Sequence, residues 1–270
     1  MRWLRRLLLL LLIIILVPIV LVVGIIAADA SFGAEATDYT NVSYPAADGT
    51  TLHSYLAMPE GEGPFPGVLM VHEWWGLNGE ITELADRMAE EGYVVLAPDT
   101  YRNATTNQIP RALYLRITVP EDRVDGDMQA AFDYLATLSE VDSETIGVIG
   151  FCYGGGVALR YAIDNPEIAA TVNLYGDMIA DPTAFGALLE EGAGPVLGIF
   201  GREDAQIPVE EVQAFDQALD TAEIDNTVTI YDGMGHAFVQ PEVIDEGGAP
   251  EEAWQQILAF FDDHLRSEDA

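Results

Sequence analysis

The chain has 270 residues, of which 50% are hydrophobic, and a formal net charge of −34 at pH 7. This length and composition allow one large domain with a buried core and argue against two small ones. The negative charge excludes nucleic acid as a partner, because such a surface repels phosphate backbones and anionic lipid headgroups. Only one cysteine is present, so no intrachain disulfide can form.

The basic residues are unusual, because all 11 of them are arginine and lysine is absent. An acidic excess of this size weakens a compact state by self-repulsion unless salt screens it. We therefore expect adaptation to a salt-rich habitat, and an ordinary acidic exported protein is the alternative.

The sequence opens with an apolar segment. Arginines at positions 2, 5 and 6 precede an uncharged stretch from Leu7 to Ala28. About 20 apolar residues span a bilayer, so residues 1–30 are predicted to be a retained membrane anchor. The small residues around Asp29 also resemble a signal-peptide cleavage site, which is the alternative. With either an anchor or a signal peptide, the following domain is exported. Only a retained anchor would leave the protein attached to the membrane.

A hairpin is expected soon after this segment. Residues 31–39 are small, polar and acidic, which is typical of a flexible linker, so the folded domain is expected to cover residues 40–270. Two β-rich runs, 41–44 and 51–57, are separated by a segment that ends in Asp-Gly, a pair favoured in tight turns. They predict two antiparallel strands.

Strand and helix patterns alternate through the rest of the chain. Apolar runs without polar alternation are typical of parallel strands that are covered on both faces. The expected strands are 67–71, 93–97, 145–149, 168–174, 196–200 and 227–231, and helical stripes begin at Ile81, Val212 and Trp254. The predicted class is α/β: a doubly wound, mostly parallel sheet with an N-terminal antiparallel hairpin, preceded by a hydrophobic helix. Functional loops should follow the carboxyl ends of the strands.

A nucleophile elbow is predicted at residues 150–155, where the expected strand 145–149 meets Gly-Phe-Cys-Tyr-Gly-Gly. Glycines on both sides of Cys152 allow the strand and helix backbones to approach closely in a strained turn. The following helix N-terminus should favour a thiolate. The alternative is a small buried cysteine with no chemistry. A phosphate-binding loop is excluded, because it requires a lysine.

An acid and a histidine follow later strands in the order expected of an α/β-hydrolase. Asp204 comes just after the strand 196–200, and His236 just after the strand 227–231. His236 would accept the proton of the thiol and pass it to the leaving group, while Asp204 would hold the imidazole in the required tautomer.

The other three histidines lack this setting. His53 lies in the hairpin and His264 on the final helix, where packing or solvation is expected. His72 stands beside Glu73, as in zinc proteases, but Gly76 occupies the place of the second histidine of that motif. We therefore expect no metal ion and no cofactor.

Four motifs together resemble the dienelactone hydrolase family over about residues 41–265. They are His-Glu-Trp-Trp-Gly at 72–76, Ala-Pro-Asp-Thr-Tyr at 97–101, the elbow at 150–155, and the Asp204 and His236 pair. The resemblance implies an α/β-hydrolase fold and a Cys152, Asp204 and His236 triad. It also implies that Glu73 gates the resting thiol, and that the backbone N–H groups of Trp74 and Tyr153 form an oxyanion hole.

Substrate contacts are the least constrained part of the resemblance. Classical members hold a carboxylate with two arginines, whereas this chain has Arg102 near one such position and Gln240 at the other. We therefore expect an apolar or aromatic acyl or lactone substrate in preference to a dianion. The candidate substrate contacts are Arg102, Tyr101, Trp75, Phe238 and Gln240.

These patterns predict a monomeric hydrolase that cleaves a small ester or lactone through an acyl-cysteine intermediate. A non-catalytic binding module of the cell envelope is the alternative, because a fold alone does not establish activity. A peptidase is the third hypothesis, and it is disfavoured because a thiolate suits esters better than unactivated amides.

Overall fold

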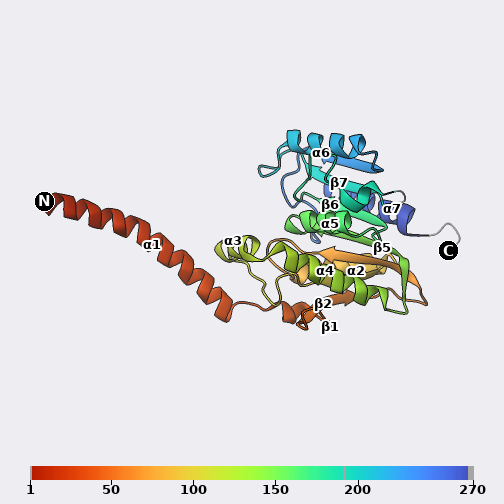
Figure 1. Ribbon diagram of the computed structural model, residues 1–270, viewed down its shortest axis with the longest axis horizontal. Coiled ribbons are helices and arrows are strands. Elements are labelled where there is room, and N and C mark those ends of the chain that lie inside the picture. Colours follow the sequence, from red (N-terminus) through yellow and green to blue (C-terminus); the bar gives the residue numbers. More distant parts are fainter. Residues whose placement is uncertain (1, 191–192, 267–270) are drawn as a thin grey trace.

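The computed structural model describes residues 2–190 and 193–266, and it contains the predicted mostly parallel sheet (Figure 1). The strands are β1 (Val42–Pro45), β2 (Thr51–Ala57), β3 (Phe65–Val71), β4 (Val94–Pro98), β5 (Val141–Phe151), β6 (Ala170–Leu174), β7 (Val196–Gly201) and β8 (Asn226–Tyr231). The helices are α1 (Arg2–Phe32), α2 (Gly79–Glu90), α3 (Ile109–Thr118), α4 (Glu121–Ala136), α5 (Tyr153–Asp164), α6 (Val209–Thr221) and α7 (Ala249–Leu265). Two 3₁₀ helices are η1 (Ala36–Tyr39) and η2 (Gly186–Leu189).

The sheet has eight strands in the order β1-β2-β4-β3-β5-β6-β7-β8. The predicted hairpin is confirmed: β1 and β2 are antiparallel, with Val42 opposite Ser54 and Pro45 opposite Thr51. Its turn contains Gly49 at φ 82°, a conformation that glycine adopts without steric cost. β2 also pairs antiparallel with β4, and all the following pairings are parallel.

Helices cover both faces of this sheet. A Cβ atom added to Gly67 would lie 3.2 Å from Leu135 of α4, whereas one added to Gly147 would lie 2.8 Å from Phe261 of α7. Gly147 pairs with Val68, the residue that follows Gly67. Successive residues of a strand point to opposite faces, so α4 and α7 lie on opposite sides of the sheet. The hydrophobic core fills the two layers between sheet and helices.

The segment expected to be a flexible linker is instead ordered. α1 continues to Phe32, and η1 packs against the domain with Ala36 fully buried. The backbone N–H of Thr37 donates to Oδ1 of Asn103 at 2.9 Å. The composition of residues 31–39 predicted a mobile linker. The buried side chain of Ala36 and the hydrogen bond from Thr37 to Asn103 instead attach this segment to the domain.

α1 extends away from the rest of the structure (Figure 1). Its stretch Leu10–Phe32 has 23 residues, none of which is buried. This stretch is long and apolar enough to cross a bilayer, and a signal sequence near the N-terminus meets the same test.

Candidate active site

The parallel strands deliver the predicted site residues to one edge of the sheet. Glu73 follows β3, Cys152 follows β5, Asp204 follows β7 and His236 follows β8. Because the carboxyl ends of parallel strands meet at the same edge, residues far apart in sequence become neighbours there. Cys152 and His236 in fact line the same pocket.

The elbow at Cys152 has the strained backbone that its sequence predicts. Cys152 has φ 53° and ψ −115°, and its N–H donates to the carbonyl oxygen of Leu174 at 2.9 Å. A Cβ atom on Gly150 would lie 1.9 Å from the carbonyl oxygen of Gly154, and one on Gly154 would lie 2.3 Å from that of Val71. The turn therefore requires glycine at both positions, because any side chain would collide with backbone.

His236 and Asp204 are paired. Nδ1 of His236 lies 2.7 Å from Oδ2 of Asp204, whose side chain is fully buried. The other carboxylate oxygen accepts the N–H groups of Gln206 at 2.7 Å and Ile207 at 3.2 Å, which fix its orientation. Nε2 of His236 is buried and has no hydrogen-bond partner among the described residues. The ring is thus held by one nitrogen, and the other is available as a base in a residue that lines the same pocket as Cys152.

The pocket that contains Cys152 and His236 has a volume of about 240 Å³. Its walls include the aromatic residues Trp74, Tyr153 and Tyr175, which suit an apolar ligand. The lining residues are Trp74, Arg116, Cys152, Tyr153, Tyr175, Gly176, Asp177, Gln206, Ile207 and His236.

The environment of Cys152 favours the neutral thiol. Burial raises the pKa of Cys152 to about 12, and the charge of Glu73 acts in the same direction. The backbone N–H groups of Tyr153 and Trp74 oppose this rise by hydrogen bonding. The N–H of Tyr153, the first residue of α5, thus favours the thiolate as expected, but burial outweighs this local effect and the pKa of Cys152 is raised overall.

The pKa values of Glu73 and His72 are shifted from those of free side chains. Burial, followed by the charge of Glu80, raises the pKa of Glu73 to about 7. Burial lowers the pKa of His72 to about 4, so its ring is neutral at physiological pH. That ring bonds Oγ1 of Thr100 at 2.9 Å and the carbonyl oxygen of Glu73 at 2.6 Å. His72 thereby fixes the backbone at Glu73.

Arg102 does not line the pocket. Its Nε and Nη2 donate to the two carboxylate oxygens of Asp127 at 2.9 Å and 2.7 Å, and Nη1 lies 3.0 Å from Asp48. Asp127 is buried, so this bidentate pair anchors the loop after β4 to α4. The guanidinium expected at the substrate is therefore engaged elsewhere.

The other expected substrate contacts also lie outside the pocket lining. Tyr101 is buried, with its ring centroid 5.0 Å from that of His72. The ring centroid of Trp75 lies 4.9 Å from that of Trp74. Phe238 is buried, and its ring centroid lies 5.9 Å from that of Tyr175. Gln240 is exposed, and its backbone carbonyl accepts from Val243 and Ile244. Tyr101, Trp75 and Phe238 therefore pack behind aromatic residues of the lining, whereas Gln240 lies at the surface.

Arg116 of α3 is the cation that the structure brings to the pocket. Its Nη2 lies 2.5 Å from Oδ2 of Asp177, and its guanidinium carbon lies 5.3 Å from the ring centroid of Tyr153. Sequence reasoning missed both Arg116 and Asp177. No local motif marks them, because α3 and the loop after β6 meet only in the folded chain.

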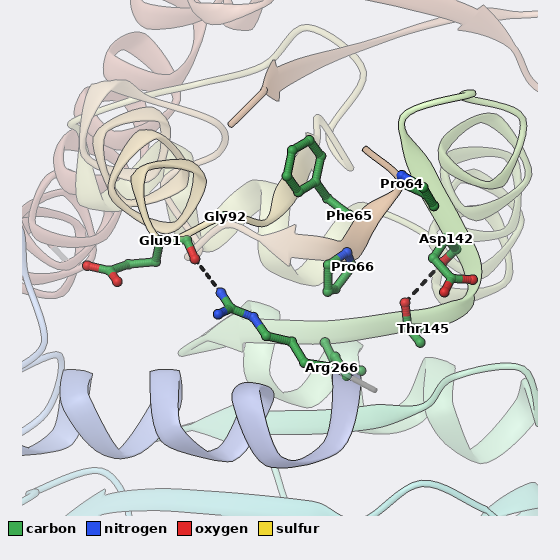
Figure 2. Close-up of a pocket in the computed structure, with 9 residues that line it drawn as sticks. Pro64, Phe65, Pro66, Glu91, Gly92, Asp142, Thr145 and Arg266 are labelled. Carbon is green, nitrogen blue, oxygen red and sulfur yellow. Dashed lines mark hydrogen bonds between the residues drawn. The ribbon is translucent and has the colours of Figure 1, made fainter. Parts of the chain in front are cut away.

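A larger pocket of about 400 Å³ lies at the opposite end of the strands (Figure 2). Its lining includes Phe65 at the start of β3, Thr145 of β5 and Arg266 after α7, which donates to the carbonyl oxygen of Glu91. None of the described residues that line it is a cysteine, serine or histidine. The chemistry-bearing residues therefore gather at the carboxyl ends of the strands.

Comparisons with known proteins agree with this geometry. The family model "Dienelactone hydrolase family" matches residues 52–265. A Yersinia pestis protein provisionally named a carboxymethylenebutenolidase is 30% identical over 80% of this chain and 85% of its own length. An Escherichia coli protein with the same provisional name is 31% identical, over 79% and 83%. The crystal structure of a provisionally named dienelactone hydrolase from Klebsiella pneumoniae covers 83% of this chain and all of its own, with a TM-score of 0.71 and 28% identity. The predicted α/β-hydrolase fold is thereby confirmed.

Proposed function

Because the chain belongs to the dienelactone hydrolase family, we propose that it hydrolyses a small ester or lactone with the Cys152 thiol as nucleophile. One observation carries this assignment. Asp204 holds Nδ1 of His236 at 2.7 Å, the buried Nε2 lacks a partner among the described residues, and His236 lines the same pocket as Cys152. A base held in this way beside a thiol is the arrangement that nucleophilic catalysis needs.

The proposed reaction proceeds in two halves. Nε2 of His236 accepts the proton of the thiol as the sulfur attacks the carbonyl carbon of the substrate. The tetrahedral intermediate then collapses, the C–O bond breaks, and His236 returns the proton to the leaving alcohol oxygen. Water, deprotonated by His236, next attacks the acyl-cysteine, and the thiol leaves with the returned proton. For a lactone, the alcohol and the acid belong to one product.

The backbone N–H groups of Trp74 and Tyr153 would stabilise the negative oxygen of each intermediate. Both already lie close enough to lower the pKa of the Cys152 thiol by hydrogen bonding. One donor follows the nucleophile directly and the other comes from the loop after β3, which is the usual composition of an oxyanion hole in this fold.

Glu73 would keep the thiol neutral until substrate binds. Its charge contributes to the raised pKa of Cys152, and its own pKa of about 7 allows it to change protonation under mild conditions. A substrate that displaces or protonates Glu73 would remove one obstacle to thiolate formation. We therefore assign Glu73 a positioning role and no bond-making step.

The substrate is proposed to be neutral or singly charged. Among the described residues, the pocket lining contains one cation, Arg116, and its guanidinium is paired with Asp177. The lining also includes the aromatic residues Trp74, Tyr153 and Tyr175, which favour an apolar or aromatic acyl group. The name carboxymethylenebutenolidase belongs to the relatives, and a dianionic lactone would find only half of a cationic clamp here.

We also propose that the domain acts outside the cytoplasm. The arginines before the apolar stretch of α1 favour retention of that end on the cytoplasmic side, which exports the residues that follow. The segment serves either as a retained anchor or as a signal sequence.

One observation favours a non-catalytic binding module as the second candidate. A half-buried thiol whose pKa is raised to about 12, in part by the charge of Glu73, is unreactive unless ligand binding changes its surroundings. A module of this kind would use the aromatic pocket for binding alone.

Hydrolysis by the wild-type chain and by Cys152→Ala separates the two candidates. Both should be assayed against p-nitrophenyl acetate and a panel of small lactones, in low and in molar salt, with folding verified by circular dichroism. Loss of hydrolysis in the variant supports the thiol mechanism. Equal rates in both proteins, or saturable lactone binding without turnover, would favour the binding module.

A further inference from the structure

The outer face of α3 is apolar. Among the described residues outside α1, exposed large hydrophobic side chains occur at Met58, Ile109, Leu113, Tyr114, Ile117 and Leu189. Four of these lie on α3, and Ile109 and Ile117 are 62% and 71% exposed. A spacing of four residues places Ile109, Leu113 and Ile117 on one side of the helix, opposite the buried Ala112 and Leu115. We call Ile109, Leu113, Tyr114 and Ile117 the α3 face.

The same segment departs from the charge of the rest of the chain. No acidic residue occurs between Asp99 and Glu121, whereas this stretch contains Arg102, Arg111 and Arg116. The whole chain carries a formal charge of −34, so its surface in general repels anionic headgroups. α3 is thus a local exception, with two arginines at the border of an apolar face. That combination is typical of a helix that lies in the plane of a membrane interface.

α3 also touches the helix that is able to cross a bilayer. α1 contacts α3, and Figure 1 shows α3 at the side of the domain that faces α1. Among the α1 side chains that the structure describes, only Ile26 and Asp29 are half-buried, and the rest are exposed. These two residues lie in the last part of the stretch Leu10–Phe32. If that stretch spans the bilayer, its outer end holds α3 at the level of the headgroups.

We propose that the α3 face inserts into the outer surface of the lipid bilayer and brings the mouth of the catalytic pocket to that surface. Apolar side chains of such a helix enter the boundary between headgroups and acyl chains, while arginine heads remain in the headgroup layer. Tyr114, with Arg111 packed 5.7 Å from its ring centroid, has the amphipathic character that this layer favours.

The position of Arg116 connects this surface to the substrate. Arg116 lines the pocket and stacks on Tyr153, and its neighbour Ile117 belongs to the α3 face. A molecule that enters the pocket beside α3 therefore arrives from the bilayer. The substrate class follows as a lipophilic ester or lactone that partitions into lipid, an inference that rests on the proposed hydrolase function.

Depth measurements on the full chain test the docking without any need for activity. Cys152→Ala removes the native thiol, and Leu113→Cys then carries a single environment-sensitive fluorophore. Gln213→Cys on α6, an exposed site, is the matched control. In vesicles of equal parts phosphatidylcholine and phosphatidylglycerol, spin-labelled lipids should quench the label at 113 and leave the label at 213 bright. Equal emission at both sites would overturn the docking, and self-quenching between labels at 113 would assign the face to a second copy of the chain.

Activity in the same vesicles tests delivery of substrate. Leu113→Gln with Ile117→Gln should lower hydrolysis of a lipid-partitioned long-chain p-nitrophenyl ester by about tenfold, and leave hydrolysis of water-soluble p-nitrophenyl acetate unchanged. Met58→Gln with Leu189→Gln removes two exposed apolar side chains elsewhere, 42% and 45% exposed, and should change neither rate. A long-chain rate unaffected by the α3 variant would overturn the substrate assignment. If the wild type hydrolyses neither ester, the proposed function fails while the fluorescence result still decides the docking.

Discussion

Replacing Glu73 with glutamine should stabilise the protein above neutral pH. Burial, and then the charge of Glu80, raises the pKa of Glu73 from 4.5 to about 7. Between these values the folded state binds more protons than the unfolded state, so stability falls as pH rises through this window and stays lower above it. Each tenfold change in the proton equilibrium corresponds to about 1.4 kcal/mol, so the full penalty is at most about 3 kcal/mol.

Urea unfolding of the wild type and Glu73→Gln at fixed molar salt measures this penalty. At about pH 4 the two proteins should differ little, whereas at about pH 8.5 the variant should be more stable by about 2–3 kcal/mol. Comparison at equal pH cancels the titration of the other acidic residues. Glu60→Gln, at an exposed loop position, is the control and should show no such pH-dependent gain. A gain that is the same at both pH values would refute the raised pKa of Glu73.

The same variant should also change the reactivity of the thiol. Burial is the main cause of the raised pKa of Cys152, and the charge of Glu73 is the next. Removing that charge lowers the pKa of the thiol, and each unit gives about ten times more thiolate at a given pH. Iodoacetamide should therefore label Cys152 up to about tenfold faster in Glu73→Gln at about pH 8.5, with a smaller gain at about pH 6. Identical labelling rates at both pH values would mean that Glu73 does not control the thiol.

Four further outcomes are expected. Asp204→Asn should lower kcat for p-nitrophenyl acetate by about 10²–10⁴-fold with little change in KM, because an amide no longer stabilises the imidazolium; a rate within twofold of wild type would contradict the role of Asp204. Gly150→Ala should cost more than about 4 kcal/mol in urea unfolding, because its Cβ would lie 1.9 Å from a carbonyl oxygen, and a wild-type midpoint would disprove the close approach. Arg116→Gln should raise KM for a carboxylate-bearing lactone more than for a neutral lactone of the same size; equal changes would argue against anion contact. Molar salt should raise Tm, because it screens the charge of −34, whereas a Tm independent of salt would contradict salt adaptation.

Much of the fold follows from local patterns in the chain. The apolar runs that become β3 to β7 are recognisable because strands covered on both faces need apolar residues at successive positions. The glycines around Cys152 predict the elbow, because the close approach of Gly150 to Gly154 leaves no room for a side chain at position 150. α3 and α4 were not predicted as helices. In α3 the apolar residues occupy both the buried and the exposed side, so its pattern lacks the polar face that marks a surface helix.

The candidate site also has features that the sequence predicts and features that depend on tertiary contacts. By itself, the sequence determined the elbow at Cys152 and the order in which Asp204 and His236 follow their strands, because topology requires that order in this fold. Only the tertiary structure decided that Arg116, and not Arg102, reaches the pocket, since the loop at Arg102 turns its guanidinium toward Asp127. The raised pKa of Cys152 likewise depends on burial and on Glu73 from the loop after β3. These properties depend on contacts between residues distant in sequence, and the chain acquires them only on folding.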